Sequence, residues 1–188
     1  MNSGTEKLNI RKASIVVLGL ALLMGFVFLQ NDVERTENGE FNRNDVMFMN
    51  MMIVHHNQAI EMAELSENRT DNENILELSR NISEAQTREN RQMIEWMQDM
   101  GYSPGNHHPM AGMASREEMQ QLENSNGSEY NRLFAELMIE HHEGGIAMAQ
   151  NFYSSGENSE LREMQGEMID AQQKEIEKMQ DWQKNNQL

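Results

Sequence analysis

The sequence matches itself at a fixed offset of 86 residues, and this internal repeat is the feature that most constrains the fold. Residues 48–63 match 134–149, and residues 85–96 match 171–182 in the same register. The identical positions pair Phe48, Met52, Ile53, His55, His56, Ile60, Met62, Ala63, Ala85, Gln86, Glu89, Met93 and Trp96 with Phe134, Met138, Ile139, His141, His142, Ile146, Met148, Ala149, Ala171, Gln172, Glu175, Met179 and Trp182. So many identities at one offset predict a duplicated structural unit.

Each repeat is predicted to be a pair of helices, because apolar residues recur with helical spacing and strand-like alternation is nearly absent. The expected helices cover residues 43–67, 72–100, 116–153 and 158–185, the third with a break near 124–127. Short links within each pair predict antiparallel neighbours. The fold class is therefore all-α: an up-down four-helix bundle over 43–188, with repeat halves at about 43–100 and 129–186 related by a pseudo-twofold axis.

The N-terminal segment contains an uninterrupted apolar stretch, with three cationic residues before it and acidic residues after it. We expect a cytoplasmic N-terminus at 1–12, a transmembrane anchor at 13–30 and a polar linker at 31–42. A cleaved signal peptide is the alternative, although no small-residue A-x-A pattern follows the stretch. In either case the bundle is expected on the extracytoplasmic side, in the periplasm or at the cell exterior.

The composition excludes several kinds of site. The chain has no Cys, so disulfides and thiolate metal sites are excluded. Its net charge of -16 argues against nucleic acid as a partner, because an acidic surface repels phosphates. It contains 18 Met, more than filling gaps in a core explains.

The His-His pairs of the two repeats lie on the apolar faces of the first and third predicted helices. At 100° per residue, His56 and His142 fall in the middle of these faces, and His55 and His141 fall at their edges. We therefore expect ions to reach His55 and His141 more easily. Flanking methionines at i-3 and i+7 are further candidate ligands: Met52, Met62, Met138 and Met148.

The second and fourth helices place polar residues among their apolar ones, namely Gln86, Glu89, Gln172 and Glu175. A buried carboxylate needs a partner, and the inward histidines of the neighbouring helices are the natural choice. His56–Glu89 and His142–Glu175 are either polar pairs that fix the helix register, or metal ligands and their supports. The sequence leaves both interpretations open.

The segment between the repeats, residues 101–114, is a loop rich in glycine and proline. It holds two imidazoles and two thioethers within seven residues: His107, His108, Met110 and Met113. Imidazole and thioether ligands suit Cu(I), and Ag(I) by analogy, better than Mg(II) or Ca(II). Zn(II) bound through histidine is a weaker alternative.

The blocks MMIVHHNQAIEMAELS and LFAELMIEHHEGGIAMAQ, the following Q-x-x-E-x-x-x-M-x-x-W helices and the HHPMAGM loop resemble the family called domain of unknown function 305. The resemblance covers about residues 43–186. It implies a ferritin-like fold and extracytoplasmic copper or silver binding or resistance, with ligands among the histidines and methionines named above. One departure is Gly144–Gly145, where the first repeat has Gln58–Ala59. The two glycines weaken a helix interior, or let another helix or a ligand approach closely.

Three functions remain open from the sequence. The first is Cu(I) or Ag(I) binding for sequestration, transfer or resistance, with a copper-handling partner or a homo-oligomer. The second is a membrane-tethered helical interaction module without metal. The third is a carboxylate-bridged di-metal oxidase, which the missing Glu-x-x-His spacing disfavours. We find no catalytic triad order, phosphate loop or nucleotide motif, and expect no enzyme activity.

Overall fold

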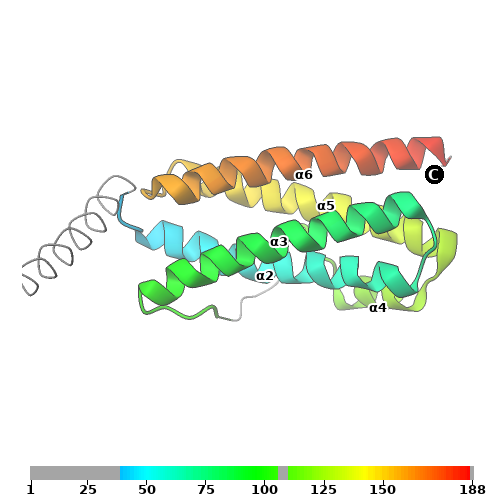
Figure 1. Ribbon diagram of the computed structural model, residues 1–188, viewed down its shortest axis with the longest axis horizontal. Helices are drawn as coiled ribbons and strands as arrows, with labels where there is room; N and C mark the ends of the chain where they lie inside the picture. Colours follow the sequence, from blue (N-terminus) through cyan, green and yellow to red (C-terminus); the bar gives the residue numbers. More distant parts are fainter. Residues whose placement is uncertain (1–38, 106–109, 187–188) are drawn as a thin grey trace, which may run out of the picture. The chain divides into compact units, whose positions relative to one another are not determined.

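The computed structural model describes residues 39–105 and 110–186, and every regular element in these ranges is helical (Figure 1). The elements are α2 (Arg43–Leu65), the 3-10 turn η1 (Ser66–Asn68), α3 (Glu73–Asp99), α4 (Arg116–Asn124), α5 (Gly127–Tyr153) and α6 (Ser159–Asn185). The all-α prediction is confirmed. The predicted break in the third helix is the gap between α4 and α5.

Short polar side chains fix where the helices begin. Asn42 accepts hydrogen bonds from the backbone of Asn44 and Asp45, and the Asp45 carboxylate accepts one from the Asn42 backbone. Asn72 and Asn158 cap α3 and α6 in a similar way, through the backbone of the third helical residue. Such caps satisfy backbone N–H groups that lack a partner within the helix.

The long helices form two antiparallel pairs, α2 with α3 and α5 with α6, and the pairs meet where α2 packs against α5. At one end of this contact, the Tyr130 hydroxyl at the start of α5 donates to the Met62 carbonyl near the end of α2, at 2.9 Å. At the other end, the Asn42 side chain donates to the Ser155 carbonyl, at 2.8 Å. α2 and α5 are therefore antiparallel.

The order of helix directions corrects the simple up-down expectation. Since α3 and α5 both run opposite to α2, the four helices run up, down, down and up along the chain (Figure 1). The segment between α3 and α4 must return along the bundle, and we call it the crossover. The sequence predicted a loop here, but loop composition does not specify which end of the bundle it reaches. Four-helix bundles with one long crossover are an established arrangement.

The core consists of two apolar clusters. The first cluster is built mainly from aliphatic and aromatic residues, including Leu122, Tyr130 and Phe134, with four methionines: Met62, Met119, Met138 and Met179. The second, which we call the methionine cluster, contains ten methionines, fully or partly buried: Met49, Met51, Met52, Met93, Met97, Met100, Met110, Met148, Met164 and Met168. Methionine is therefore concentrated in one part of the core.

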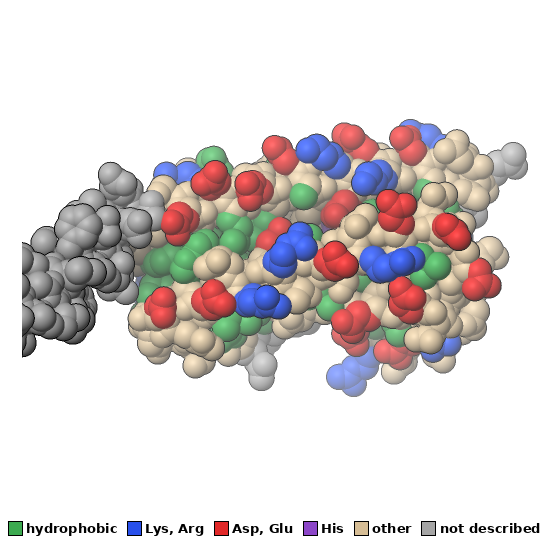
Figure 2. Space-filling model, in the orientation of Figure 1, with side chains coloured by type: hydrophobic (Ala, Val, Ile, Leu, Met, Phe, Trp, Pro, Cys, Tyr) green, Lys and Arg blue, Asp and Glu red, His purple; other side chains and the backbone are tan. Residues whose placement is uncertain are grey.

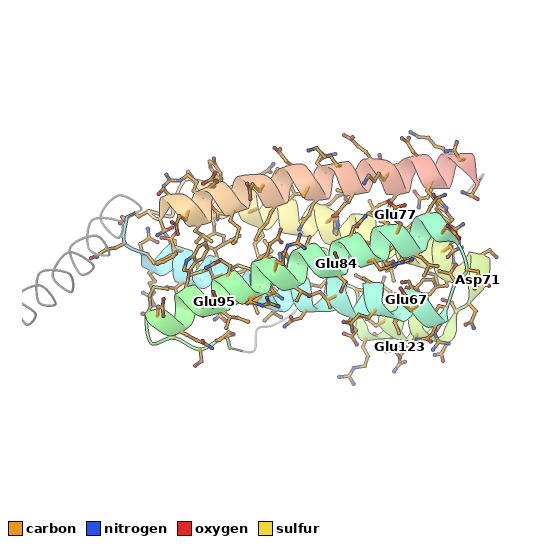
Figure 3. All side chains as sticks on the ribbon, in the orientation of Figure 1. Glu67, Asp71, Glu77, Glu84, Glu95 and Glu123 are labelled. Carbon is orange, nitrogen blue, oxygen red and sulfur yellow. The ribbon has the colours of Figure 1, made fainter. Side chains whose placement is uncertain are left out.

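Acidic side chains dominate the outside of the bundle. Figure 2 shows Asp and Glu spread over the visible face with fewer Lys and Arg between them, and hydrophobic side chains gathered between α3 and α6 near the start of α6. Glu77, Glu84 and Glu95 lie at exposed positions of α3 (Figure 3). This surface agrees with the negative charge expected from the sequence.

The predicted cytoplasmic N-terminus, the anchor at 13–30 and most of the linker lie outside the described residues. Among the residues that the structure does describe, no helix is both long enough and apolar enough to cross a membrane.

Candidate functional site

His55 and His141 meet where α2 crosses α5. Their ring centroids are 3.8 Å apart with an angle of 37° between the rings, and both residues are 0% exposed. The expectation that ions reach these two histidines more easily was therefore wrong. A single helix places them at the edge of its apolar face, but the antiparallel partner helix covers that edge.

The four ring nitrogens of His55 and His141 have no hydrogen-bond partner. Burial lowers the pKa of His55 from 6.5 to about 3, helped by the charges of His56 and His142, while the backbone of Ala111 acts in the opposite direction. The pKa of His141 is also well below 6.5, mainly because of burial and then because of His55. Both imidazoles are therefore neutral near pH 7 and keep a free lone pair.

The other two histidines are paired with glutamates, as the facing pattern predicted. The His56 Nε2 lies 2.8 Å from a Glu89 carboxylate oxygen, and the His142 Nε2 lies 2.8 Å from the equivalent oxygen of Glu175. The histidine side chains are 0% exposed, whereas those of Glu89 and Glu175 are 22% and 14% exposed. In each pair, a fully buried imidazole is hydrogen-bonded to a carboxylate that is partly exposed to solvent.

Gln86 and Gln172 are two further polar residues inside the bundle. Both are buried, and the Gln86 carboxamide oxygen and nitrogen and the Gln172 carboxamide oxygen have no hydrogen-bond partner. A Cβ added at Gly145 would lie 2.7 Å from the Gln172 oxygen and 3.3 Å from the His55 ring, so this glycine allows their close approach. Buried polar atoms without partners are uncommon and call for an explanation.

The predicted methionine ligands divide between the two clusters. Met52 and Met148 lie in the methionine cluster, whereas Met62 and Met138 lie in the first cluster. The structure therefore separates the two methionines that flank each histidine in sequence. Because α2 and α5 are antiparallel, each cluster instead contains one of these methionines from each repeat.

The crossover contacts α2 and α5 close to the histidines. Met110 packs on the methionine cluster and Met113 is half-buried, while His107 and His108 lie outside the described residues. Gln58 on α2 binds the Ala114 backbone twice, accepting from its N–H at 2.8 Å and donating to its carbonyl at 2.9 Å. The sequence alone did not indicate this role of Gln58. The available signal was its difference from Gly144 in the second repeat.

Gly144 explains the departure between the repeats. A Cβ added there would lie 2.1 Å from the Ala111 carbonyl oxygen and 2.8 Å from the Gly112 Cα. A side chain cannot fit, so the glycine lets the crossover backbone lie directly on α5. The expectation of a close approach is met, but the segment that approaches Gly144 is the crossover backbone, not the helix or ligand that was expected.

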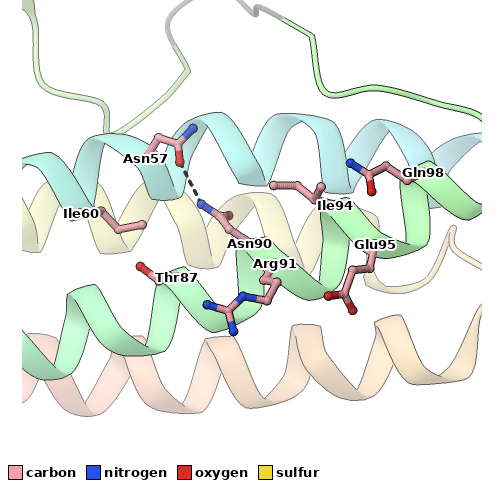
Figure 4. A pocket seen from close by; sticks show the side chains of 8 residues that line it. All are labelled: Asn57, Ile60, Thr87, Asn90, Arg91, Ile94, Glu95 and Gln98. Carbon is pink, nitrogen blue, oxygen red and sulfur yellow. Dashed lines mark hydrogen bonds between the residues drawn. The ribbon is translucent and has the colours of Figure 1, made fainter.

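A separate surface groove lies between α2 and α3 (Figure 4). The Asn90 side chain donates to the Asn57 side chain in it, at 3.0 Å. Asn57, Ile60, Thr87, Asn90, Arg91, Ile94, Glu95 and Gln98 line the groove. None of the predicted site residues is among them. In the described part of the chain, no three His, Asp or Glu residues are arranged to hold a metal ion by themselves.

A family model and several solved structures that resemble this chain all indicate the same family. The family model described as a domain of unknown function, DUF305, matches residues 45–183. A DUF305 protein from Streptomyces coelicolor thought to be secreted is 29% identical, with a TM-score of 0.70, over 76% of this chain and 93% of that one. A DUF305 fragment from Deinococcus radiodurans is 27% identical, with a TM-score of 0.71, over 76% and 97%.

CopM, solved in a Cu(I)-bound form, is 30% identical, with a TM-score of 0.66, over 75% of this chain and 96% of that one. CopM has also been solved in silver-bound and Cu(II)-bound forms. No curated protein matches this chain.

Proposed function

The chain belongs to the DUF305 family, and on that premise we propose that it binds Cu(I) or Ag(I) through histidine and methionine, outside the cytoplasm. The observation that carries the proposal is the similarity to CopM, a protein solved with Cu(I) bound, which extends over 96% of the CopM chain. Because the metal is cargo, its binding serves sequestration, transfer or resistance and needs no catalytic residue. The bundle, with its single crossover, is assigned to the ferritin-like class.

The ligands available in the described part of the chain fit a soft metal. His55 and His141 are neutral imidazoles whose nitrogens have no partner, and neutral imidazole is the form that binds metals. Thioethers lie in both clusters of the core. The proposed ligands are His55, His56, His141, His142, Met52, Met62, Met138 and Met148, with the crossover residues His107, His108, Met110 and Met113. Gln86, Glu89, Gln172 and Glu175 are proposed to orient them.

Soft ligands in a chain without Cys favour Cu(I) and Ag(I) over Zn(II). Thioethers also cannot form disulfides, which suits an oxidising compartment. The similarity to a DUF305 protein thought to be secreted supports an extracytoplasmic location. We propose that residues 13–30 act as the membrane anchor. Fractionation of expressing cells tests this, because a protein released without detergent would exclude the anchor.

The experiment that tests metal binding is an anaerobic Cu(I) titration of the full chain against a competing chelator. Zn(II) and Fe(II) are titrated in parallel. We expect Cu(I) to be held against the chelator and the other two ions to bind far more weakly. Failure to compete for Cu(I) would overturn the proposal and favour an interaction module.

A further inference from the structure

The two positions that hold the crossover are equivalent positions of the repeat, yet they carry different residues. Gln58 on α2 corresponds to Gly144 on α5 at the offset of 86 residues. Gln58 holds the Ala114 backbone through two hydrogen bonds, whereas Gly144 leaves room for the backbone of Ala111 and Gly112. A single crossover cannot contact both halves in the same way, so the symmetry of the sequence breaks where the crossover lies.

The crossover backbone also lies beside the buried histidine pair. A Cβ added at Gly144 would lie 2.1 Å from the Ala111 carbonyl oxygen, and one added at the adjacent Gly145 would lie 3.3 Å from the His55 ring. His55 and His141 are fully enclosed although their four ring nitrogens have no partner. Any ion or molecule that reaches these nitrogens must first displace something that covers them.

We infer that residues 110–114 form a strap over the His55–His141 pair, and that Gln58 is the positioning residue that latches the strap closed. Within the strap, the described backbone hydrogen bonds are the Met113–Met110 turn and those to Gln58, and Met110 and Ala114 also pack against the two core clusters. Lifting it requires breaking the two Gln58 bonds, withdrawing Met110 and Ala114 from the core and moving backbone off Gly144, without unfolding a long helix. Access to the pair is then set by Gln58.

The latch rests on the proposed function for its purpose, but its test does not need metal. Diethyl pyrocarbonate modifies neutral, accessible imidazoles, and mass spectrometry resolves the peptides that contain His55 and His141 from the crossover peptide. A hydrogen bond is worth about a factor of five in an equilibrium constant. Gln58→Ala should therefore raise the modification rate of His55 and His141 roughly twentyfold. Gln58→Glu keeps one acceptor and should raise it about fivefold.

Matched variants distinguish loss of the Gln58 latch from a general increase in the flexibility of the bundle. Gln150→Ala removes an exposed glutamine from α5 and should leave the rate unchanged. Gly144→Ala, whose Cβ would overlap the Ala111 carbonyl, should raise the rate as Gln58→Ala does. Circular dichroism selects the folded variants. In the Cys-free chain, cross-linking thiols introduced by Gln58→Cys and Ala114→Cys should suppress modification.

A second experiment measures the binding of Ag(I) to the same variants. Gln58→Ala should raise the association and dissociation rates by similar factors and leave the equilibrium constant nearly unchanged, since a latch acts on access. Equal modification rates in Gln58→Ala, Gln150→Ala and the wild-type chain would overturn the latch. That result differs from failure of the proposed function, which is absence of Cu(I) or Ag(I) binding in the unmodified chain.

Discussion

The ring centroids of His55 and His141 lie 3.8 Å apart, and each repeat contributes one of the two rings. Neither hairpin alone contains this pair, because it forms only where α2 packs against α5. A chain cut into its two hairpins would lose the pair even if each hairpin stayed helical. Any ligand of these imidazoles therefore stabilises the contact between the halves.

Acid should destabilise the metal-free protein in a defined pH range. Burial lowers the pKa of His55 to about 3 and that of His141 well below 6.5, so the unfolded chain binds more protons in acid. The contribution of both groups is fully present above about pH 6.5 and falls in acid; that of His55 is lost as the pH falls towards 3. Each group adds to the unfolding free energy a slope that approaches about 1.4 kcal/mol per pH unit as the pH falls below 6.5.

Urea unfolding of the metal-free chain between pH 5 and 6.5 measures this slope, in a range where most carboxylates stay ionised. His141→Gln should reduce the slope by about half. An identical slope in the variant would contradict the assignment to the histidine pair.

The glutamate of each polar pair should contribute more to the stability of the fold than exposed glutamates on the same helix. Glu89→Ala removes the partner of His56, whose Nε2 would stay buried and unsatisfied, at a cost of about 1–3 kcal/mol. The matched control is Glu84→Ala, at an exposed position of the same helix, expected within about 0.5 kcal/mol. Chemical denaturation followed by circular dichroism compares the two.

Methionine in the methionine cluster should be replaceable for folding but not for metal binding. Met52→Leu with Met148→Leu conserves volume, so each change should cost less than about 1.5 kcal/mol. The Ag(I) stoichiometry should nevertheless fall. Met119→Leu with Met179→Leu, in the first cluster, is the control and should keep it. Equal stoichiometry in both double variants would remove Met52 and Met148 from the proposed ligands.

Asp45 should be one of the most sensitive acidic residues for stability. Its buried carboxylate accepts backbone hydrogen bonds from Asn42, Glu157 and Asn158, so it joins the start of α2 to the turn before α6. Asp45→Ala should cost about 3 kcal/mol, because hydrogen bonds to a charged group are stronger than average. Thermal unfolding against the exposed Asp71→Ala control checks this, together with faster amide exchange at Glu157.

The sequence predicted the local structure well because local residues determine it. Asn72 and Asn158 cap helices that begin within one residue of the expected positions. The repeat predicted His56–Glu89 and His142–Glu175, because equal spacing along paired helices brings the same residues together. These features depend on one helix or on one hairpin.

Features that depend on contact between the hairpins were not predicted. The burial of His55 depends on which side of α2 is covered by α5, and a helical wheel of α2 alone cannot show this. The direction of α5 depends on how far the crossover travels, which its Gly and Pro content does not specify. Gly144 marked the place where the crossover lies, but its partner, the Ala111 carbonyl, is distant in sequence.

The two hairpins are fastened to each other at opposite ends. Asp45, from the first hairpin, holds the turn of the second, and Tyr130, from the second, holds the Met62 carbonyl of the first. Neither hairpin can peel away from one end without breaking a hydrogen bond that the other supplies. A state in which the α2–α5 contact is opened at only one end should therefore not be stable. We expect the bundle to unfold in a single cooperative transition.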